Sequence, residues 1–439
     1  MTLLAFISAA DCWVMAAGVL CNVACSLLGC YLVLRRMALL GDAISHAILP
    51  GLALAFIVTN SRSVLPMFCG ALVVGVATTF LIQTLHQWGR VPEDSSMGVV
   101  FTSLFALGVL LITYVASSVD LDPGCVLYGD IGATPAFQLV IAGQEWPIPR
   151  QVAILLCVLM VDLAVILLIY KELKIVSFDP LLATTMGINA TFVHYTLMIL
   201  VAGTSVAAFE SVGSILVVAM LIAPPAAAHL LTDRLPRMLA VSAIIAALSA
   251  IGGYMIAAYV VDTPPAAMMA VVAGCIFALS VFFAPKYGVI SRRLDQTRLA
   301  VRIASEDILG MLYRWQESLQ PTPLNVGTVL SAMRGGFLAR IALRSLQRSG
   351  RIERFDSDVL RLTVQGQSEA KGLVRAHRLW ESYLNKHFGL PLDHLHAPAE
   401  RMEHFVTKAM QEQIAAEVQP TTDPHGREIP PIAEWKGTI

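Results

Sequence analysis

The chain has 439 residues, of which 56% are hydrophobic and 14% are charged, and its formal net charge at pH 7 is −1. A soluble globular protein carries about 25% charged residues, so this composition excludes that class and indicates a largely membrane-embedded chain. The charges gather at one end, because residues 291–439 hold 20 of the 30 Lys and Arg residues. We therefore expect a membrane domain followed by a polar domain.

Nine apolar segments are long enough to cross a membrane as helices, which takes roughly 17 to 25 residues each. They fall near residues 13–34, 37–58, 65–84, 97–118, 151–170, 191–208, 211–232, 237–260 and 266–285. Pro224 and Pro225 are expected to break or kink the seventh. Lys and Arg residues concentrate in alternate loops, with only Arg62 and Arg150 in the other set. Since basic loops stay in the cytoplasm, we predict an outside N-terminus and a cytoplasmic polar domain.

The second segment carries two ionisable side chains, Asp42 and His46, within the run RRMALLGDAISHAILPG. Residues four apart share one face of a helix. An Asp in lipid costs roughly 3 kcal/mol, so a helix that keeps such a group normally turns it toward a cavity or pathway. The spacing alone leaves two interpretations open. One is a metal site on a cation path, and the other is a carboxylate that caps a break near Gly41 beside a structural histidine.

The longer run LVLRRMALLGDAISHAILPG resembles the second-helix signature of the manganese/zinc/iron ABC importer permeases. The resemblance implies an all-α polytopic membrane domain over residues 1–290, in the bacterial plasma membrane, with Asp42 and His46 lining the transport site for the metal. It also implies an ATP-binding subunit, an extracytoplasmic metal-binding protein and a second permease subunit as partners, besides membrane lipid. The chain itself has no G-x-x-x-x-G-K-[ST] motif, so we expect no ATP site and no enzymatic activity in it. A facilitator that works without ATP is a further alternative.

The loop KELKIVSFDPLLATTMGI is predicted to form a short amphipathic helix that starts at Asp179-Pro180 and stops at Gly187. In the permeases that the chain resembles, the equivalent loop is the coupling helix that docks into the ATPase subunit. The resemblance therefore implies contacts with the ATPase for Phe178, Leu182, Ala183 and Met186. Composition alone fits an ordinary connector equally well.

Residues 291–302 are predicted to be a linker and residues 303–367 a winged helix-turn-helix domain. The stretch VGTVLSAMRGGFLARIALRSLQRSG indicates a helix, a Gly-containing turn and a second helix, and RIERFDSDVLRLTVQG indicates a hairpin. Arg340, Arg344 and Arg348 recur every four residues along the second helix, where basic residues meet the phosphates or base edges of operator DNA. A solvated basic face is the alternative.

Residues 368–439 are predicted to be helical and are rich in metal-ligating side chains. Glu400, Glu403 and His404 have the spacing of one helical face, and with His377 they form a candidate site with mixed oxygen and nitrogen ligands. A solvated polar face fits that spacing equally well. The order SEDIL, LTVQGQSEA, HRLWESYL, AERMEH and DPHGREIP resembles the iron- and manganese-dependent repressors of the diphtheria-toxin-repressor and manganese-transport-regulator type. The similarity covers residues 303–431 and implies a metal-binding and dimerisation domain.

The repressor resemblance implies two sets of metal ligands. The regulatory set is Asp307, His377, Glu400, Glu403 and His404, and the second set is His377, Glu381 and His396. Iron sensors of the family place a Met and a Cys where this chain has Asp307 and Glu400. Hard oxygen ligands favour Mn²⁺, with Fe²⁺ or Zn²⁺ as alternatives. Two roles stay open for such a domain: a metal-dependent repressor that binds DNA, or a gate that inhibits transport without binding DNA.

Overall fold

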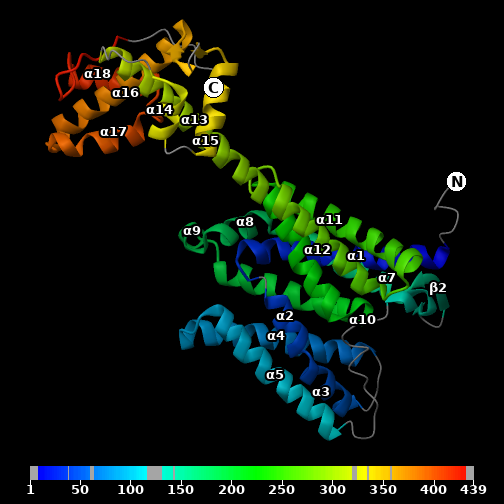
Figure 1. Ribbon diagram of the computed structural model, residues 1–439. Coiled ribbons are helices and arrows are strands. Elements are labelled where there is room, and N and C mark those ends of the chain that lie inside the picture. Colours follow the sequence, from blue (N-terminus) through cyan, green and yellow to red (C-terminus); the bar gives the residue numbers. More distant parts are fainter. Residues whose placement is uncertain are drawn as a thin grey trace. The chain divides into compact units, whose positions relative to one another are not determined.

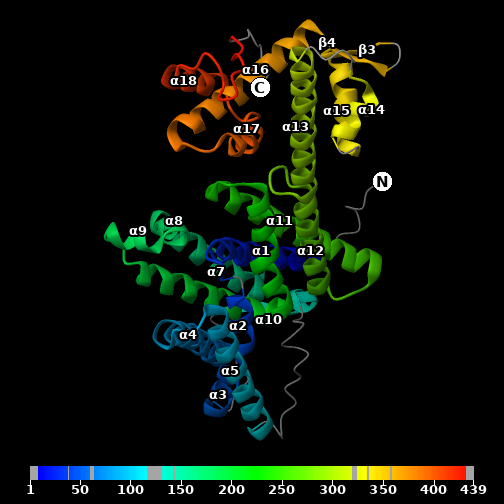
Figure 2. The same ribbon diagram turned by 60° about the vertical axis from the view of Figure 1, so that its left-hand side comes forward.

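The computed structural model describes residues 8–37, 39–59, 64–115, 131–141, 144–318, 324–333, 336–355 and 358–431. The chain forms two compact units, Met1–Ser291 and Arg292–Ile439. We call the first the membrane unit and the second the tail, and describe each by itself. Figure 1 labels the helices of both, and Figure 2 also labels the strands of the tail.

The membrane unit is built almost entirely of helices. In the part of the chain that the structure describes, eight helices are long and apolar enough to cross a membrane, and a shorter apolar helix covers Leu216–Leu231. The expected all-α domain of about nine spans is therefore confirmed. Its elements are α1 (Ala9–Leu34), α2 (Leu40–Ala47), α3 (Leu49–Thr59), α4 (Val64–Gly89), α5 (Glu93–Val115), β1 (Gln138–Ile141), β2 (Gln144–Pro149), α7 (Arg150–Leu168), α8 (Tyr170–Phe178), α9 (Pro180–Thr185), α10 (Ala190–Leu231), α11 (Leu235–Ile256) and α12 (Pro265–Phe283).

Helix α1 lies at the centre of one group of helices, where it packs against α10, α11 and α7 (Figures 1 and 2). Its side chains Cys21, Leu28 and Tyr31 are fully buried in the apolar core. Helices α3, α4 and α5 pack together as a second group. The short helix α2 contacts both α10 and α5, so the residues of the Asp42 motif lie where the two groups meet.

Helix α10 contains the sixth and seventh predicted spans, and of the break or kink expected at the proline pair, the break does not occur. The chain stays helical through Pro224 and Pro225, and the non-helical residue is Gly213, with φ 74° and ψ 165°. Pro225 has no N–H for the carbonyl of Leu221, four residues earlier. That carbonyl instead approaches α1 so closely that a Cβ on Gly29 would lie 2.1 Å from its oxygen. Close helix packing thus accommodates the prolines without a break.

The tail confirms the predicted winged helix followed by a helical domain. Its elements are α13 (Val289–Glu317), α14 (Val326–Ala332), α15 (Phe337–Arg348), β3 (Ile352–Arg354), β4 (Leu360–Leu362), α16 (Val364–Phe388), α17 (His396–Met402) and α18 (Lys408–Val418). The antiparallel pair β3 and β4 forms the wing after the second helix of the motif. Separate apolar clusters fill the winged helix and the C-terminal helices, including Ile308 and Leu346 in the first and Leu379 and Ile414 in the second.

Residues 291–302 belong to α13, so this expected linker is helical. Figure 2 shows α13 as one long helix. Two ion pairs at helical spacing run along it, Asp295 with Arg298 at 3.6 Å and Arg302 with Glu306 at 2.9 Å. Such pairs stabilise a helix by about 0.2–0.5 kcal/mol each, which favours helix in a stretch with little apolar surface to bury.

Candidate metal centres

Asp42 and His46 lie on α2 one turn apart, as their spacing predicts. The distance from His46 Nε2 to Asp42 Oδ1 is 3.5 Å, and their side chains are 34% and 42% exposed respectively. The rings of Phe101 and Phe105 on α5 lie beside the imidazole, with centroids 6.1 and 5.8 Å away. Most of the remaining α2 residues are buried. The carboxylate and the imidazole are thus the accessible polar groups of an otherwise packed helix.

The backbone breaks immediately after this pair, between α2 and α3. Pro50 has no N–H to donate to the carbonyl of His46, four residues earlier. Polar backbone groups at breaks of this kind are tolerated in membranes where they face protein or line a cavity. Within the described residues of the membrane unit, no three His, Cys, Asp or Glu side chains gather around one point. The pair therefore offers one oxygen and one nitrogen ligand.

The loop after α7 forms α8 and α9, and its sequence signals appear as predicted. Asp179 caps α9 by accepting hydrogen bonds from the N–H groups of Leu181 and Leu182, both at 3.0 Å. Gly187 ends the segment at φ +81°. The side chains of Phe178, Leu181, Leu182 and Met186 are exposed. These four side chains form an exposed apolar surface. Ala183, which we expect at the ATPase contact, is fully buried and does not belong to this surface, whereas Leu181 does.

In the tail, two carboxylates of α13 meet two residues that follow α17. His404 Nδ1 lies 2.8 Å from Glu306 Oε2, and its Nε2 lies 3.2 Å from Asp307 Oδ1. Asp307, Glu403 and His404 have ligand atoms close enough together to hold one ion. We call Glu306, Asp307, Glu403 and His404 the oxygen-rich cluster. Asp307, Glu403 and His404 offer two carboxylates and one imidazole, which fit a hard divalent cation such as Mn²⁺, and Glu306 contacts the other nitrogen of the His404 ring.

The carboxylates of this cluster favour positive charge, as the pKa values of His404 and Glu306 show. Burial lowers the pKa of His404, but the carboxylates of Asp307 and Glu306 outweigh burial and raise that pKa to about 9. Burial raises the pKa of Glu306, and His404 and Arg302 lower it by more. At neutral pH the metal-free cluster therefore carries a proton on His404, which an incoming metal ion must displace.

A second group, His377, Glu381 and His396, also has ligand atoms close enough together to hold an ion. His377 Nε2 lies 3.0 Å from both Glu381 Oε1 and His396 Nδ1. We call these three residues the nitrogen-rich cluster. Its imidazoles and single carboxylate fit a borderline divalent cation. The sequence prediction of this set is consistent with the geometry, because the structure brings all three side chains together.

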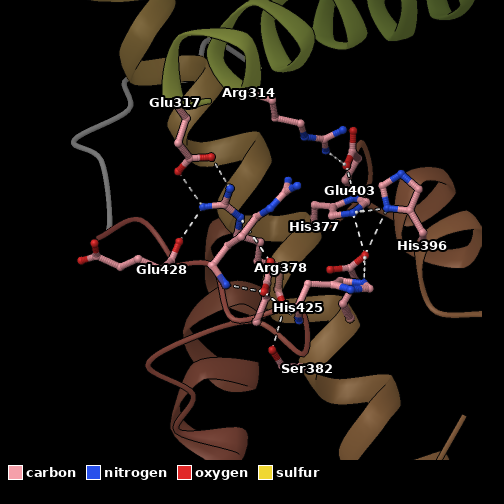
Figure 3. A network of polar contacts seen from close by, with 12 residues as sticks. Arg314, Glu317, His377, Arg378, Ser382, His396, Glu403, His425 and Glu428 are labelled. Carbon is pink, nitrogen blue, oxygen red and sulfur yellow. Dashed lines mark hydrogen bonds and ion pairs between the residues drawn. The ribbon is translucent and has the colours of Figure 1, made fainter. Parts of the chain in front are cut away.

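Glu403 connects the two clusters. Its Oε2 lies 2.5 Å from His377 Nδ1 and 3.1 Å from Arg314 Nη2 (Figure 3). Arg314 lies on α13 and His377 on α16, so three elements converge on one carboxylate that is only 3% exposed. Without a metal ion, the guanidinium of Arg314 supplies the positive charge that this buried carboxylate needs.

Glu400 does not join either cluster, although the sequence places it on one helical face with Glu403 and His404. Helix α17 ends at Met402, and residues 403–405 form a turn. Glu403 keeps right-handed helical angles and its N–H donates to the Ala399 carbonyl, yet its side chain is buried, whereas that of Glu400 is exposed. His377, expected in the regulatory set, contributes to the oxygen-rich cluster only through Glu403.

Two residues near the clusters were missed by the sequence analysis, Glu306 and His425. Glu306 directly precedes Asp307, and neighbours on a helix normally point in different directions. His425 Nε2 lies 3.9 Å from Glu381 Oε1, across 44 residues of chain. No local pattern predicts that contact, and the only signal was a lone histidine in DPHGREIP.

Arg340, Arg344 and Arg348 form an exposed stripe on α15, the second helix of the winged-helix motif. The opposite face packs into the tail through Ala342, Leu343 and Leu346. The predicted spacing and exposure of the basic residues agree with the fold.

Comparison with known proteins assigns both units. Residues 10–284 match the family model "ABC 3 transport family", and residues 363–431 match "Iron dependent repressor, metal binding and dimerisation domain". The manganese transport system membrane protein MntD of Bacillus subtilis is 45% identical over 284 residues, 65% of this chain and 95% of that protein. The zinc transport system membrane protein TroD of Treponema pallidum is 37% identical over 372 residues, 82% of this chain and 97% of that protein.

A solved structure supports the same assignment of the membrane unit. PsaBC from Streptococcus pneumoniae in complex with Fab is 34% identical, with a TM-score of 0.52, over 63% of this chain and 92% of that one. The match with TroD is longer than the membrane unit, so it extends into the tail. The chain is therefore a multi-pass membrane protein of the ABC 3 transport family, with an iron-dependent-repressor metal-binding domain fused behind its permease domain.

Proposed function

We propose that this chain is the permease subunit of an ATP-driven importer of a divalent transition metal, Mn²⁺ in preference to Zn²⁺ or Fe²⁺, and that its tail binds cytosolic metal. The observation that carries the proposal is the presence of metal-ligand sets in both units, Asp42 with His46 in the membrane and the oxygen-rich cluster in the tail. The names of the relatives, which concern manganese and zinc transport, support the choice of cargo.

In this proposal an extracytoplasmic binding protein delivers the cation to the outer side of the membrane unit. Asp42 supplies a hard anionic oxygen and His46 a nitrogen, so together they replace part of the hydration shell of the ion. The permease works with a second permease subunit and with an ATP-binding subunit that docks on the exposed apolar side chains of α8 and α9. The N-terminus lies outside and the tail lies in the cytoplasm of a bacterial cell, as the distribution of basic loops predicts.

Metal uptake by proteoliposomes that contain the complete transporter tests the transport site. We expect Asp42→Ala and His46→Ala to abolish ATP-dependent Mn²⁺ uptake, while Asp94→Ala, which removes an exposed acidic residue of α5, leaves uptake intact. Uptake that survives both substitutions would show that Asp42 and His46 do not form the transport site. Uptake that persists without any ATPase subunit would favour the facilitator.

The docking surface is tested by pull-down of the ATPase subunit. Leu181→Asp places a charge on the most exposed apolar side chain of α9 and is expected to abolish the association. Thr184→Asp is the control, because Thr184 is also exposed on α9 but is not one of the apolar side chains of the docking surface. Equal binding by the wild type and the Leu181 variant would contradict the docking proposal.

A second function, DNA binding by the tail, is supported by the exposed stripe Arg340, Arg344 and Arg348. Contacts of Arg with phosphates make affinity fall steeply as salt rises. A gel shift of an operator fragment with the full-length protein in nanodiscs, with and without Mn²⁺, separates this function from a gate. A metal-dependent shift that the triple alanine variant loses supports a repressor. Metal binding that slows transport, without any shift, supports the gate.

A further inference from the structure

Arg35 directly follows the last residue of α1, and its guanidinium lies among side chains of α8 and α10. Its Nε donates to the hydroxyl of Ser177 on α8 at 3.3 Å, and its Nη1 lies 3.1 Å from Nδ1 of His194 on α10. A guanidinium has only donors, so this ring nitrogen is the acceptor. The Nη2 of Arg35 is buried as well, and among the described residues it has no hydrogen-bond partner. Three helices therefore meet at one half-buried cation.

The two partners of Arg35 are neutral groups, a hydroxyl and an unprotonated ring nitrogen. They orient the guanidinium without neutralising its charge. Holding a charge in a packed site with such partners costs free energy, which a neutral side chain would avoid. Ionisable groups that a membrane protein keeps at such a cost commonly have a functional role. Packing alone therefore does not account for an arginine at this position.

Ser177 connects Arg35 to the surface on which we expect the ATPase subunit to dock. It directly precedes Phe178, one of the exposed apolar side chains of that surface. Ser177 itself is buried, so α8 presents one residue to solvent and its neighbour to Arg35. The next residue, Asp179, caps α9, so α8 and α9 follow each other without an intervening loop. A movement of the docking surface therefore displaces the Ser177 hydroxyl.

A tightly bonded turn joins Arg35 to the helix that carries the transport residues. Arg36 takes φ 62°, at the position where helices commonly end in a left-handed glycine. The N–H of Met37 donates to the carbonyl of Leu32 at 2.9 Å, and the carbonyl of Met37 accepts from the first N–H of α2 at 3.1 Å. Met37 is buried, and Asp42 lies in the first turn of α2. A displacement of Arg35 is therefore passed to α2 through a turn that has little freedom.

We propose that Arg35 is a positioning residue for transport, which connects the docking surface on α8 and α9 to α2 and so transmits movement of the ATPase subunit to Asp42 and His46. This inference rests on the proposed import function and names the residue through which the two sites are coupled. The planar fork of a guanidinium holds two partners at fixed angles, whereas the ammonium of lysine is a point charge on a flexible stem. Arginine is thus suited to fix α8 and α10 against one turn.

Proteoliposomes that contain the complete transporter test the inference when Mn²⁺ uptake and ATP hydrolysis are followed in the same sample. Arg35→Gln is expected to lower ATP-driven uptake by about fivefold or more, the lower end of typical couplings between sites, while the ATPase subunit still associates and hydrolyses ATP. The number of ATP molecules consumed per imported ion should rise by the same factor. Arg35→Lys should restore only part of the uptake, because lysine keeps the charge without the fork.

Arg36→Asn is the matched control, because it removes the exposed charge next to Arg35 and asparagine accepts the left-handed conformation. It should keep uptake and the ATP-to-ion ratio at the wild-type values. Ser177→Ala removes the hydroxyl and leaves the guanidinium in place, and it should also raise the ratio. The double variant should be no worse than Arg35→Gln alone, because residues that act through one contact are not additive.

The outcomes separate this inference from the function on which it rests. A wild-type ATP-to-ion ratio in Arg35→Gln would overturn the role of Arg35, with ATP-driven import by the wild type still standing. Loss of ATPase association in both Arg35→Gln and Ser177→Ala would make Arg35 a support of the docking surface and would also overturn the inference. A wild-type transporter that imports no metal, or that imports it without ATP, would overturn the proposed function itself.

Discussion

We expect Arg314 to compete with a metal ion for Glu403, so removing its charge should tighten Mn²⁺ binding. The guanidinium of Arg314 lies 3.1 Å from Glu403 Oε2, and the carboxylate is buried. A metal ion that binds Glu403 must either displace this cation or accept it as a neighbour of like charge. Both possibilities cost affinity in the wild type. Arg314→Met keeps most of the length of the side chain and removes the charge.

The expected gain in Mn²⁺ affinity can be estimated from the ion pair between Arg314 and Glu403. Two charges about 4 Å apart near a protein surface interact by about 4 kcal/mol at an effective dielectric constant of 20. His377 continues to contact the same oxygen at 2.5 Å in the variant, so the carboxylate is not left unpaired. We therefore expect only part of that energy, about 1–2 kcal/mol, to appear as a gain in metal affinity. This corresponds to a decrease of about 5- to 30-fold in the Kd for Mn²⁺.

The same change should destabilise the metal-free tail, since it removes an ion pair from a buried carboxylate. Calorimetric Mn²⁺ titration and thermal unfolding of residues 292–439, which contain their own apolar clusters, measure both effects. Arg354→Met is the matched control, because it removes the exposed ion pair with Asp358 on the wing. Unchanged or weaker Mn²⁺ binding by the Arg314 variant would refute the reasoning.

Three further predictions concern other residues. The pKa of His404 rises from 6.5 to about 9, so the Mn²⁺ affinity measured by titration should increase with pH across that interval. The stability of the metal-free tail should fall across the same interval, because the stabilising proton on His404 is lost. A flat pH profile would contradict this. Glu400→Ala should leave the Mn²⁺ affinity of the tail unchanged whereas Glu403→Ala should abolish binding, and equal losses would restore Glu400 as a ligand. Gly29→Ala places a Cβ 2.1 Å from the carbonyl oxygen of Leu221 and should lower the melting temperature in detergent, unlike Gly274→Ala, whose Cβ meets nothing within 4 Å.

Sequence patterns within a short window predicted the helices, their caps and the side chains that share one helical face. Hydrophobic length gave the membrane helices, and the spacing of Asp42 and His46 placed both on one face of α2. Capping signals located α9, from Asp179 to the glycine at position 187. Each of these depends on residues a few positions apart, so the chain carries the information within a short window.

Such patterns could not predict contacts between residues that lie far apart in the sequence. Glu403 is buried beside Arg314 and His377, which lie on other helices, whereas Glu400 of the same predicted face is exposed. The repressor resemblance included most residues of the two clusters but neither Glu306 nor the neighbouring His425, whose turn is set by hydrogen bonds with Asp423. The proline pair does not end α10, and the carbonyl of Leu221 instead packs closely on Gly29 of α1, a contact between segments far apart in the sequence.

The position of Glu403 has a thermodynamic consequence for the whole tail. One oxygen of this residue faces a histidine of the nitrogen-rich cluster, while the residue itself belongs to the oxygen-rich cluster. Filling one cluster therefore changes the free energy of filling the other, and linkage requires the effect to be reciprocal, with the same factor in both directions. The two clusters are therefore coupled sites and not independent ones.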